Sequence, residues 1–111
     1  MEIYFRTKRL AALGTEHKTA VKKLGAPNAR RLAQRLQELE AAETLDELRN
    51  LPGPRCHELT GDRKGQLSVD LDHPFRLIFK PAEEPPPRKV DGGLDWRRVT
   101  SVIVVGIDDT H

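Results

Sequence analysis

The histidines and arginines of this sequence are the residues best suited to chemistry at a phosphate group. Histidine has an ordinary pKa of about 6.5, so it can accept and release a proton near neutral pH. Arginine stays charged, and its planar guanidinium can donate two parallel hydrogen bonds to a phosphate. The chain of 111 residues holds four histidines: His17, His57, His73 and His111. These residue types favour proton transfer beside a phosphate.

Basic residues gather in four stretches, although the formal net charge is only +2. These stretches are residues 6–9, 18–23, 30–35 and 63–64. A basic surface fits an anionic partner such as a nucleic acid. Solvated helix faces often have the same composition, so charge alone leaves both interpretations open.

The single cysteine, Cys56, excludes an internal disulfide and favours a reducing compartment. It precedes a strand-like segment, which is typical of a small buried hydrophobe rather than a nucleophile. The histidines and the cysteine show no metal-ligand spacing, so we expect neither a metal nor another cofactor. No apolar run approaches the ~20 residues of a membrane span, and no signal-peptide pattern is present, so we expect a cytoplasmic protein.

The first half of the chain is predicted to be mostly helical. Alternation over Glu2–Arg6 predicts a short strand, and a helical stretch follows as far as Leu24. Gly14 is a possible break in that stretch. His17 falls on its apolar stripe, so we expect a half-buried packing residue there.

A second helix is predicted after Gly25 and Pro27, which are typical of a helix end and a first helical turn. Its apolar face is predicted to comprise Ala29, Leu32, Ala33, Leu36 and Leu39. Three arginines are expected to point away from that face: Arg30, Arg31 and Arg35. Thr44 and Glu47 form a capping-box pattern that predicts a short third helix over Leu45–Asn50.

The second half of the chain is predicted to be mostly strands. The patterns indicate strands at Arg55–Thr60, Leu67–Leu71, Phe75–Phe79 and Ser101–Ile107. The last is almost continuous Val and Ile, which favours a central strand covered on both faces. We expect a turn at residues 61–65 and an irregular surface loop over Pro81–Asp95. The chain is therefore predicted to be one α+β domain, residues 1–111, with a small, mostly antiparallel sheet and two to three N-terminal helices on one face.

Three segments of the second half resemble HigB-type toxins of the RelE/ParE superfamily, which are often called plasmid-maintenance killer proteins. They are the sequences Cys-His-Glu-Leu-Thr-Gly-Asp-Arg-Lys-Gly at 56–65, Ser-Val-Asp at 68–70 and His-Pro-Phe-Arg-Leu-Ile-Phe at 73–79. The ending Asp-Asp-Thr-His at 108–111 is similar to the acidic-aromatic-histidine ending of that family. The predicted order of elements agrees with the family over nearly the whole chain.

The resemblance implies a toxin that enters the ribosomal A site and cuts mRNA while it is being translated. It also implies a cognate antitoxin encoded beside the toxin, usually a helix-turn-helix protein of HigA type. In such an enzyme the ribose 2′-OH attacks the neighbouring phosphorus, which needs a proton acceptor, a proton donor and a cation.

The same resemblance implies the site residues. His57 and His111 would transfer protons, without a choice of which is acid and which is base, and Arg76 would hold the scissile phosphate. Asp109 would orient His111 or accept a proton. Arg63 and Lys64 would contact RNA or ribosomal phosphates, and we expect Arg30, Arg31 and Arg35 to add to that surface.

Alternatives remain open for the site and for the activity. For Arg76 the alternative is a cross-strand salt bridge with Asp70 alone, worth ~0.5 kcal/mol if exposed. For His57 the alternative is a purely structural role. Thr60 and Thr110 stand where the family often has lysine and tyrosine, which removes a cation and a stacking ring. The competing functions are a non-catalytic toxin of the same fold, such as a ParE-like gyrase poison, and a degenerate toxin that acts only through antitoxin binding. Codon preference and oligomeric state do not follow from the sequence.

Overall fold

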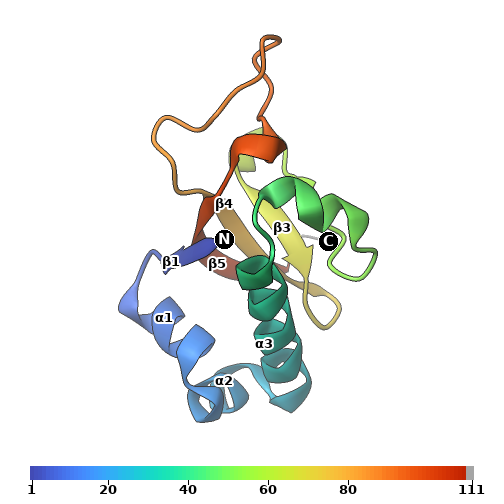
Figure 1. Cartoon of the computed structure of the whole chain (residues 1–111). Coiled ribbons are helices and arrows are strands. Elements are labelled where there is room, and N and C mark those ends of the chain that lie inside the picture. Colours follow the sequence, from blue (N-terminus) through green and yellow to red (C-terminus); the bar gives the residue numbers. More distant parts are fainter. Residues whose placement is uncertain (110–111) are drawn as a thin grey trace.

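A five-stranded mixed sheet with helices against one face forms the body of the protein (Figure 1). The computed structural model describes residues 1–109. The strands lie in the order β1-β5-β4-β3-β2, with β1 parallel to β5 and every other pair antiparallel. The longer elements are β1 (Glu2–Phe5), α1 (Lys8–Thr15), α2 (His17–Leu24), α3 (Ala26–Ala41), β3 (Leu67–Asp70), β4 (Phe75–Pro81) and β5 (Ser101–Asp109). The predicted α+β class is confirmed.

The Val- and Ile-rich strand β5 is central, as its sequence predicts, because β1 pairs with one side of it and β4 with the other. Val102 and Val104 are buried in the core between the sheet and α3. Val105 is the extra residue of a bulge, since the register with β4 shifts between Ile78 and Phe79.

Helix α3 covers the sheet with a stripe that is rotated slightly from the predicted one. Ala29, Leu32, Leu36 and Leu39 are buried as predicted, but Ala33 is exposed. The buried positions 28, 32, 35 and 39 follow helical spacing, so Asn28 and Arg35 face inward instead. Asn28 Oδ1 accepts the Asp72 backbone N–H at 2.9 Å, which ties α3 to the turn between β3 and β4. Among residues 1–109, no helix combines the length and the apolar character that crossing a membrane needs.

The first helical stretch is broken at Glu16 rather than at Gly14, giving α1 and α2. Gly14 has a packing role instead: a Cβ there would lie 2.6 Å from Cζ of Phe5, so only glycine lets α1 approach β1 this closely. The expectation of a half-buried His17 is wrong, because its side chain is exposed at the first turn of α2.

Three short elements complete the second half. The predicted short helix is a 3₁₀ helix, η1 (Leu45–Asn50), and a second 3₁₀ turn, η2 (Gly61–Arg63), occupies the predicted turn. Strand β2 (His57–Glu58) is shorter than the predicted Arg55–Thr60, because as the edge strand it pairs only with β3.

The connection from β4 to β5 is more ordered than the predicted irregular loop. An antiparallel bridge joins Arg88 to Leu94, and the Lys89 N–H donates to Gly93 O at 2.7 Å. The Asp95 N–H donates to Pro87 O at 2.9 Å, and η3 (Trp96–Arg98) follows. Residues 86–95, called the arm below, therefore form a hairpin that projects from one end of the sheet (Figure 1).

Glu83 anchors the chain just before the arm to the start of β5. One of its carboxylate oxygens accepts the Thr100 backbone N–H at 2.7 Å and the Thr100 hydroxyl at 3.0 Å. Burial raises the pKa of Glu83, but these hydrogen bonds outweigh it and hold the pKa below the ordinary value.

Because the folded pKa of Glu83 is lowered, its contribution to stability is present above the unfolded pKa of about 4.3. That contribution is lost as the pH falls through the folded pKa. We expect Glu83→Gln to unfold with a weaker pH dependence below about pH 4.3 than the unchanged protein, measured by urea unfolding at several pH values. Identical pH profiles would contradict this assignment.

Candidate functional site

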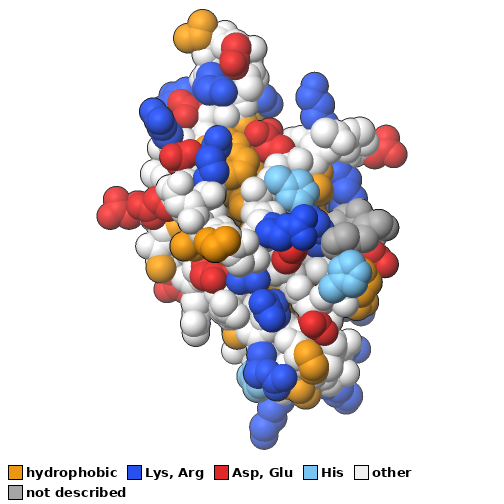
Figure 2. Space-filling view, turned by 90° about the vertical axis from the view of Figure 1, so that its right-hand side faces the viewer, with side chains coloured by type: hydrophobic (Ala, Val, Ile, Leu, Met, Phe, Trp, Pro, Cys, Tyr) orange, Lys and Arg blue, Asp and Glu red, His pale blue; other side chains and the backbone are white. Residues whose placement is uncertain are grey.

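Arg76 and His57 lie together on the sheet face opposite α3. Leu77 and Phe79 of β4 point into the core, so alternation along the strand places Arg76 on the other face. The register pairs Arg76 with Asp70 of β3, and Ser68 of β3 with His57 of β2. We call the surface formed by His57, Ser68, Asp70 and Arg76 the outer site. Figure 2 shows a histidine packed against a basic side chain near the middle of this side of the molecule.

Within residues 1–109, the side chains of His57, Ser68 and Asp70 contact the Arg76 guanidinium. Its Nη1 lies 3.0 Å from His57 Nε2 and donates to Ser68 Oγ at 3.0 Å. Its Nη2 lies 3.4 Å from Asp70 Oδ1. Arg76 is only 6% exposed, whereas His57 is exposed. The outer site therefore has a fixed positive charge in its interior, the Arg76 guanidinium, and a titratable group on its solvent side, the His57 imidazole.

The contacts of His57 fix which ring nitrogen carries the proton in the neutral form. Nδ1 lies 3.0 Å from the carbonyl oxygen of Arg55, which can only accept, so Nδ1 donates. Nε2 then carries the lone pair. Nη1 of Arg76 lies 3.0 Å from Nε2 and 3.4 Å from Nδ1, so the guanidinium lies against the face of the ring and leaves the in-plane lone pair of Nε2 to other partners. The nitrogen that faces the outer site can therefore accept a proton.

Asp70 joins the outer site to its surroundings. Its second carboxylate oxygen lies 3.5 Å from Nη1 of Arg55, whose side chain is exposed. The Asp70 backbone N–H donates to Pro54 O at 2.8 Å. The expected cross-strand contact between Arg76 and Asp70 is thus present. Arg76 is buried, however, and it also contacts His57, so it is more than one partner of an exposed salt bridge.

Arg35 was expected to face solvent and RNA, and that expectation is wrong. The side chain is 2% exposed and lies under β3 and the segment before β2. Its Nε donates to Asp70 O at 2.6 Å, and its Nη2 donates to Gly53 O at 3.0 Å. Nη1 is paired with Glu38 at 2.9 Å. Arg35 points inward because two carbonyl oxygens and a carboxylate there need its donors, so its role is to position the backbone beneath the outer site.

The turn after β2 is tied to the end of β5. Arg63 forms an ion pair with Asp108, whose Cα is in register with Arg76. Arg63 is partly exposed, and Lys64 beside it is exposed. Their predicted contacts to RNA stay predictions, and the Arg63–Asp108 pair places this turn beside the outer site.

The remaining candidates are not gathered at the outer site. Asp109 ends β5 in register with Phe75, so alternation places it on the other face from Arg76. Its predicted role with His111 stays a prediction, because His111 lies outside the described residues. Arg30 and Arg31 are exposed on α3, in the helix layer on the far side of the sheet. Their predicted contacts to RNA or the ribosome also stay predictions.

Ser68 is the residue of the outer site that the sequence patterns did not single out. It is fully buried, and its hydroxyl accepts from Arg76. The alternation along Leu67–Asp70 places Ser68 and Asp70 on one face of the sheet. That alternation is the sequence pattern from which Ser68 could have been assigned to the outer site. A buried serine on the face that carries an arginine indicates a hydrogen-bonding partner for it.

Cys56 is unsuited to act as a nucleophile beside His57. Burial raises the pKa of its thiol to about 12. In the folded protein at pH 8 we expect alkylation of Cys56 about three orders of magnitude slower than that of a free cysteine, because so little thiolate is present. The measurement is the rate of modification by iodoacetamide followed by mass spectrometry, and urea should restore the ordinary rate. A free-thiol rate without urea would contradict the buried state of the thiol.

Within residues 1–109, no group of three or more His, Cys, Asp and Glu side chains is arranged to hold a metal ion. The chemistry that the outer site offers comes from its imidazole and its guanidinium.

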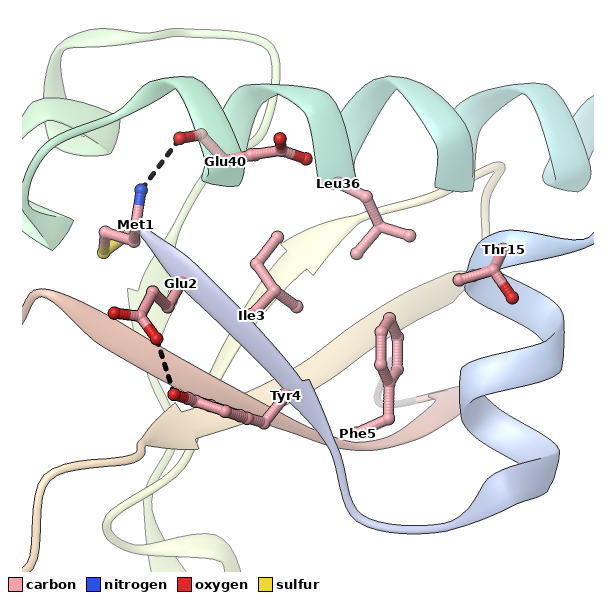
Figure 3. Close-up of a pocket in the computed structure, with 9 residues that line it drawn as sticks. Met1, Glu2, Ile3, Tyr4, Phe5, Thr15, Leu36 and Glu40 are labelled. Atoms are coloured by element: carbon pink, nitrogen blue, oxygen red, sulfur yellow. Dashed lines mark hydrogen bonds between the residues drawn. The ribbon is translucent and has the colours of Figure 1, made fainter.

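A hollow of about 450 Å³ lies beside β1, at the opposite edge of the sheet from β2 (Figure 3). Ile3, Phe5 and Leu36 give it apolar walls, and the amino terminus of Met1 donates to Glu40 O at 2.8 Å beside it. The Tyr4 hydroxyl donates to Glu2 at 2.5 Å, which together with the nearby charge raises the pKa of Tyr4. The described residues that line this hollow include no arginine, lysine or histidine, so the outer site is the better candidate for chemistry on a phosphate.

The comparisons with known proteins concern the family and the fold of the chain. The family described as the RelE-like toxin of type II toxin–antitoxin system HigB matches residues 4–85. No curated protein matches the sequence. Among solved structures, the YoeB/ParE toxin from Agrobacterium tumefaciens is similar, with a TM-score of 0.60 and 8% identity over 100% of both chains. At that identity the likeness shows the fold alone.

Proposed function

The chain belongs to the RelE-like toxins of HigB type II toxin–antitoxin systems, and on that premise we propose that it is an endoribonuclease that cuts mRNA on the ribosome. The observation that carries the proposal is the 3.0 Å contact between His57 Nε2 and the buried Arg76 guanidinium. A proton acceptor and a fixed cation in direct contact are two of the three groups that cleavage by a 2′-OH requires.

In the proposed reaction the scissile phosphate lies over Arg76, and His57 Nε2 accepts the proton of the ribose 2′-OH. The 2′-oxygen then bonds to phosphorus as the bond from phosphorus to the 5′-oxygen breaks. The products are a 2′,3′-cyclic phosphate and a 5′-hydroxyl, whose oxygen takes up a proton. Arg76 stabilises the extra negative charge on the phosphoryl oxygens, and its contacts to Ser68 and Asp70 keep it in position beforehand.

The family resemblance implies a role for His111 in proton transfer without specifying acid or base. Because His57 is assigned the 2′-OH proton, we assign the proton for the departing 5′-oxygen to His111, with Asp109 as its orienting group. The exposed cations Lys64, Arg30 and Arg31 support binding to ribosomal or messenger RNA through phosphate contacts. Arg63 supports the same role only in part, because Asp108 already neutralises its charge.

As a type II toxin the protein has an antitoxin partner. We propose that this partner is a helix-turn-helix protein of HigA type encoded in the neighbouring reading frame. Its expression should abolish the toxicity of this chain, and failure of the neighbouring protein to do so would overturn this part of the proposal.

The test of the proposed function is induction of the toxin in cells that lack the antitoxin, followed by mapping of mRNA 5′ ends. The expected result is a set of cuts within translated codons that disappears with His57→Ala and with Arg76→Ala. Toxicity with intact mRNA and with cleaved DNA trapped on gyrase would establish the non-catalytic alternative. Absence of toxicity with normal folding and antitoxin binding would establish the degenerate one.

A further inference from the structure

A cleft of about 530 Å³ lies between the arm and the turn that follows β2. The arm contributes Pro86, Arg88 and Leu94 to its walls, and the sheet side contributes Glu58, Lys64 and Pro81. The segment that matches the toxin family ends at residue 85, so the whole arm lies beyond it. Figure 2 shows the arm rising from the top of the side that carries the outer site.

The cleft begins next to the outer site. Glu58 follows His57 directly in β2, and consecutive Cα atoms are ~3.8 Å apart. Their side chains point to opposite faces, but β2 is the edge strand of the sheet, so a bound chain can pass around this edge. A nucleotide next to the one at His57 and Arg76 is thus within reach of the cleft.

The walls of the cleft suit a single nucleotide of RNA. Pro86 is partly exposed and offers an apolar surface for the face of a base, and the largely buried Pro81 and Leu94 also line the cleft. Lys64 and Arg88 bring two positive charges to the rim, where a phosphate backbone would run. The cleft therefore combines the apolar and cationic surfaces that single-stranded RNA requires.

Glu58 gives the cleft a means of distinguishing bases. One of its carboxylate oxygens accepts the Trp96 indole N–H at 2.9 Å, which fixes the side chain, while the residue remains exposed. Arg49 lies over the Trp96 ring at 4.2 Å from its centre and holds that ring in place. A carboxylate only accepts hydrogen bonds, so it favours base edges with an amino group. It disfavours uracil, whose single N3–H donor lies between two carbonyl oxygens that repel the carboxylate.

We propose that this cleft binds the base of an RNA nucleotide adjacent to the cleavage site and that Glu58 selects an amino-bearing base over uracil. The inference rests on the proposed ribonuclease function and extends it to substrate selection. Glu58→Gln tests this selection while keeping the hydrogen bond from Trp96, because the glutamine side-chain oxygen can still accept from the indole N–H. The new N–H₂ group of the glutamine can then donate to uracil.

The experiment maps the cuts made by the unchanged toxin and by Glu58→Gln in cells without antitoxin, and counts the bases at each position beside the cut. We expect uracil to be depleted about tenfold at one adjacent position with the unchanged toxin. With Glu58→Gln, cutting should continue and the depletion should disappear. Glu84→Gln, which removes an exposed carboxylate outside the cleft, is the matched control and should keep the depletion.

The outcomes separate this inference from the function on which it rests. Cuts with the same adjacent bases for all three proteins would overturn the selection by Glu58 while the nuclease stands. Absence of cuts with the unchanged toxin would overturn the nuclease itself.

A second pair of variants tests the cleft by charge. Arg88→Glu should lower the cutting rate at least about fivefold more than Arg97→Glu, because Arg97 lies just after the arm with its side chain 85% exposed and outside the cleft. Equal effects would mean that only the general charge of this region matters, and would contradict a binding cleft.

Discussion

Replacing Arg76 by alanine is expected to slow mRNA cleavage by a factor of about 10²–10³, the usual effect of removing one fixed donor to a developing negative charge. Arg76 is buried and held by Ser68 and Asp70, so it needs little rearrangement to meet a phosphate. The measurement is the single-turnover rate of cleavage on ribosomes stalled at a defined codon. Arg76→Lys should recover only part of the rate, because an ammonium group cannot donate two parallel hydrogen bonds.

The matched control for this change is Arg55→Gln. Arg55 contacts the same carboxylate, that of Asp70, at 3.5 Å, but its side chain is 66% exposed. Its loss should change the cleavage rate less than about threefold, as for an exposed ion pair. If Arg55→Gln and Arg76→Ala slow the reaction equally at unchanged thermal stability, Arg76 acts only through its pairing with Asp70 and not on the phosphate.

Replacing Arg35 by methionine is expected to lower the free energy of unfolding by about 2–4 kcal/mol, because the carbonyls of Gly53 and Asp70 lose their donor and each unsatisfied group costs about 1–3 kcal/mol. Methionine has a similar length, which limits the additional cost of a cavity. The measurement is urea unfolding followed by the fluorescence of Trp96, the single tryptophan of the chain.

Arg31→Met is the control for Arg35, since Arg31 lies on the same helix and is exposed. Its effect on the free energy of unfolding should stay within about 0.5 kcal/mol. An equally small effect of Arg35→Met would show that the guanidinium of Arg35 is dispensable in the interior. Binding of RNA weakened by Arg35→Met at unchanged stability would restore the original expectation of a surface role.

Those features of the fold that depend on local patterns could be predicted from the sequence. The run of Val and Ile over Ser101–Ile107 indicated a strand covered on both sides, and β5 is central. The apolar face of α3 was predicted to include Ala33, which is exposed, and to exclude Arg35, which is buried. Arg35 was assigned to the solvent face because it is charged, and the buried Asn28 was not among the predicted residues of the inner face. Their burial depends on partners in distant loops, which periodicity cannot reveal.

The regular hydrogen bonding within residues 81–95 could also not be predicted from the sequence. Proline and glycine correctly indicated a connection outside the sheet, but the bridge between Arg88 and Leu94 depends on how the two sides of the arm meet. The cleft beside the arm requires that geometry together with Glu58, which is about thirty residues earlier in the sequence.

At the site, hairpin register made the neighbourhood of Arg76 predictable. Alternation placed Arg76 away from Leu77 and Phe79, and the hairpin turn placed Asp70 across from it. The approach of His57 to Arg76 came from the resemblance to a family, because β2 has only two residues and its pairing to β3 carries little sequence signal. Arg35 was misassigned since its hydrogen-bond acceptors lie 18 and 35 residues away.

Cleavage of an mRNA that carries 2′-deoxyribose at the scissile nucleotide tests the central chemical claim most directly. With stalled ribosomes and purified toxin, the all-ribose message should be cut to a 2′,3′-cyclic phosphate end, and the singly deoxy-substituted message should remain intact at that position. Cutting of the deoxy-substituted message at an undiminished rate would mean that no 2′-oxygen attacks the phosphorus, and the roles given to His57 and Arg76 would fail with it.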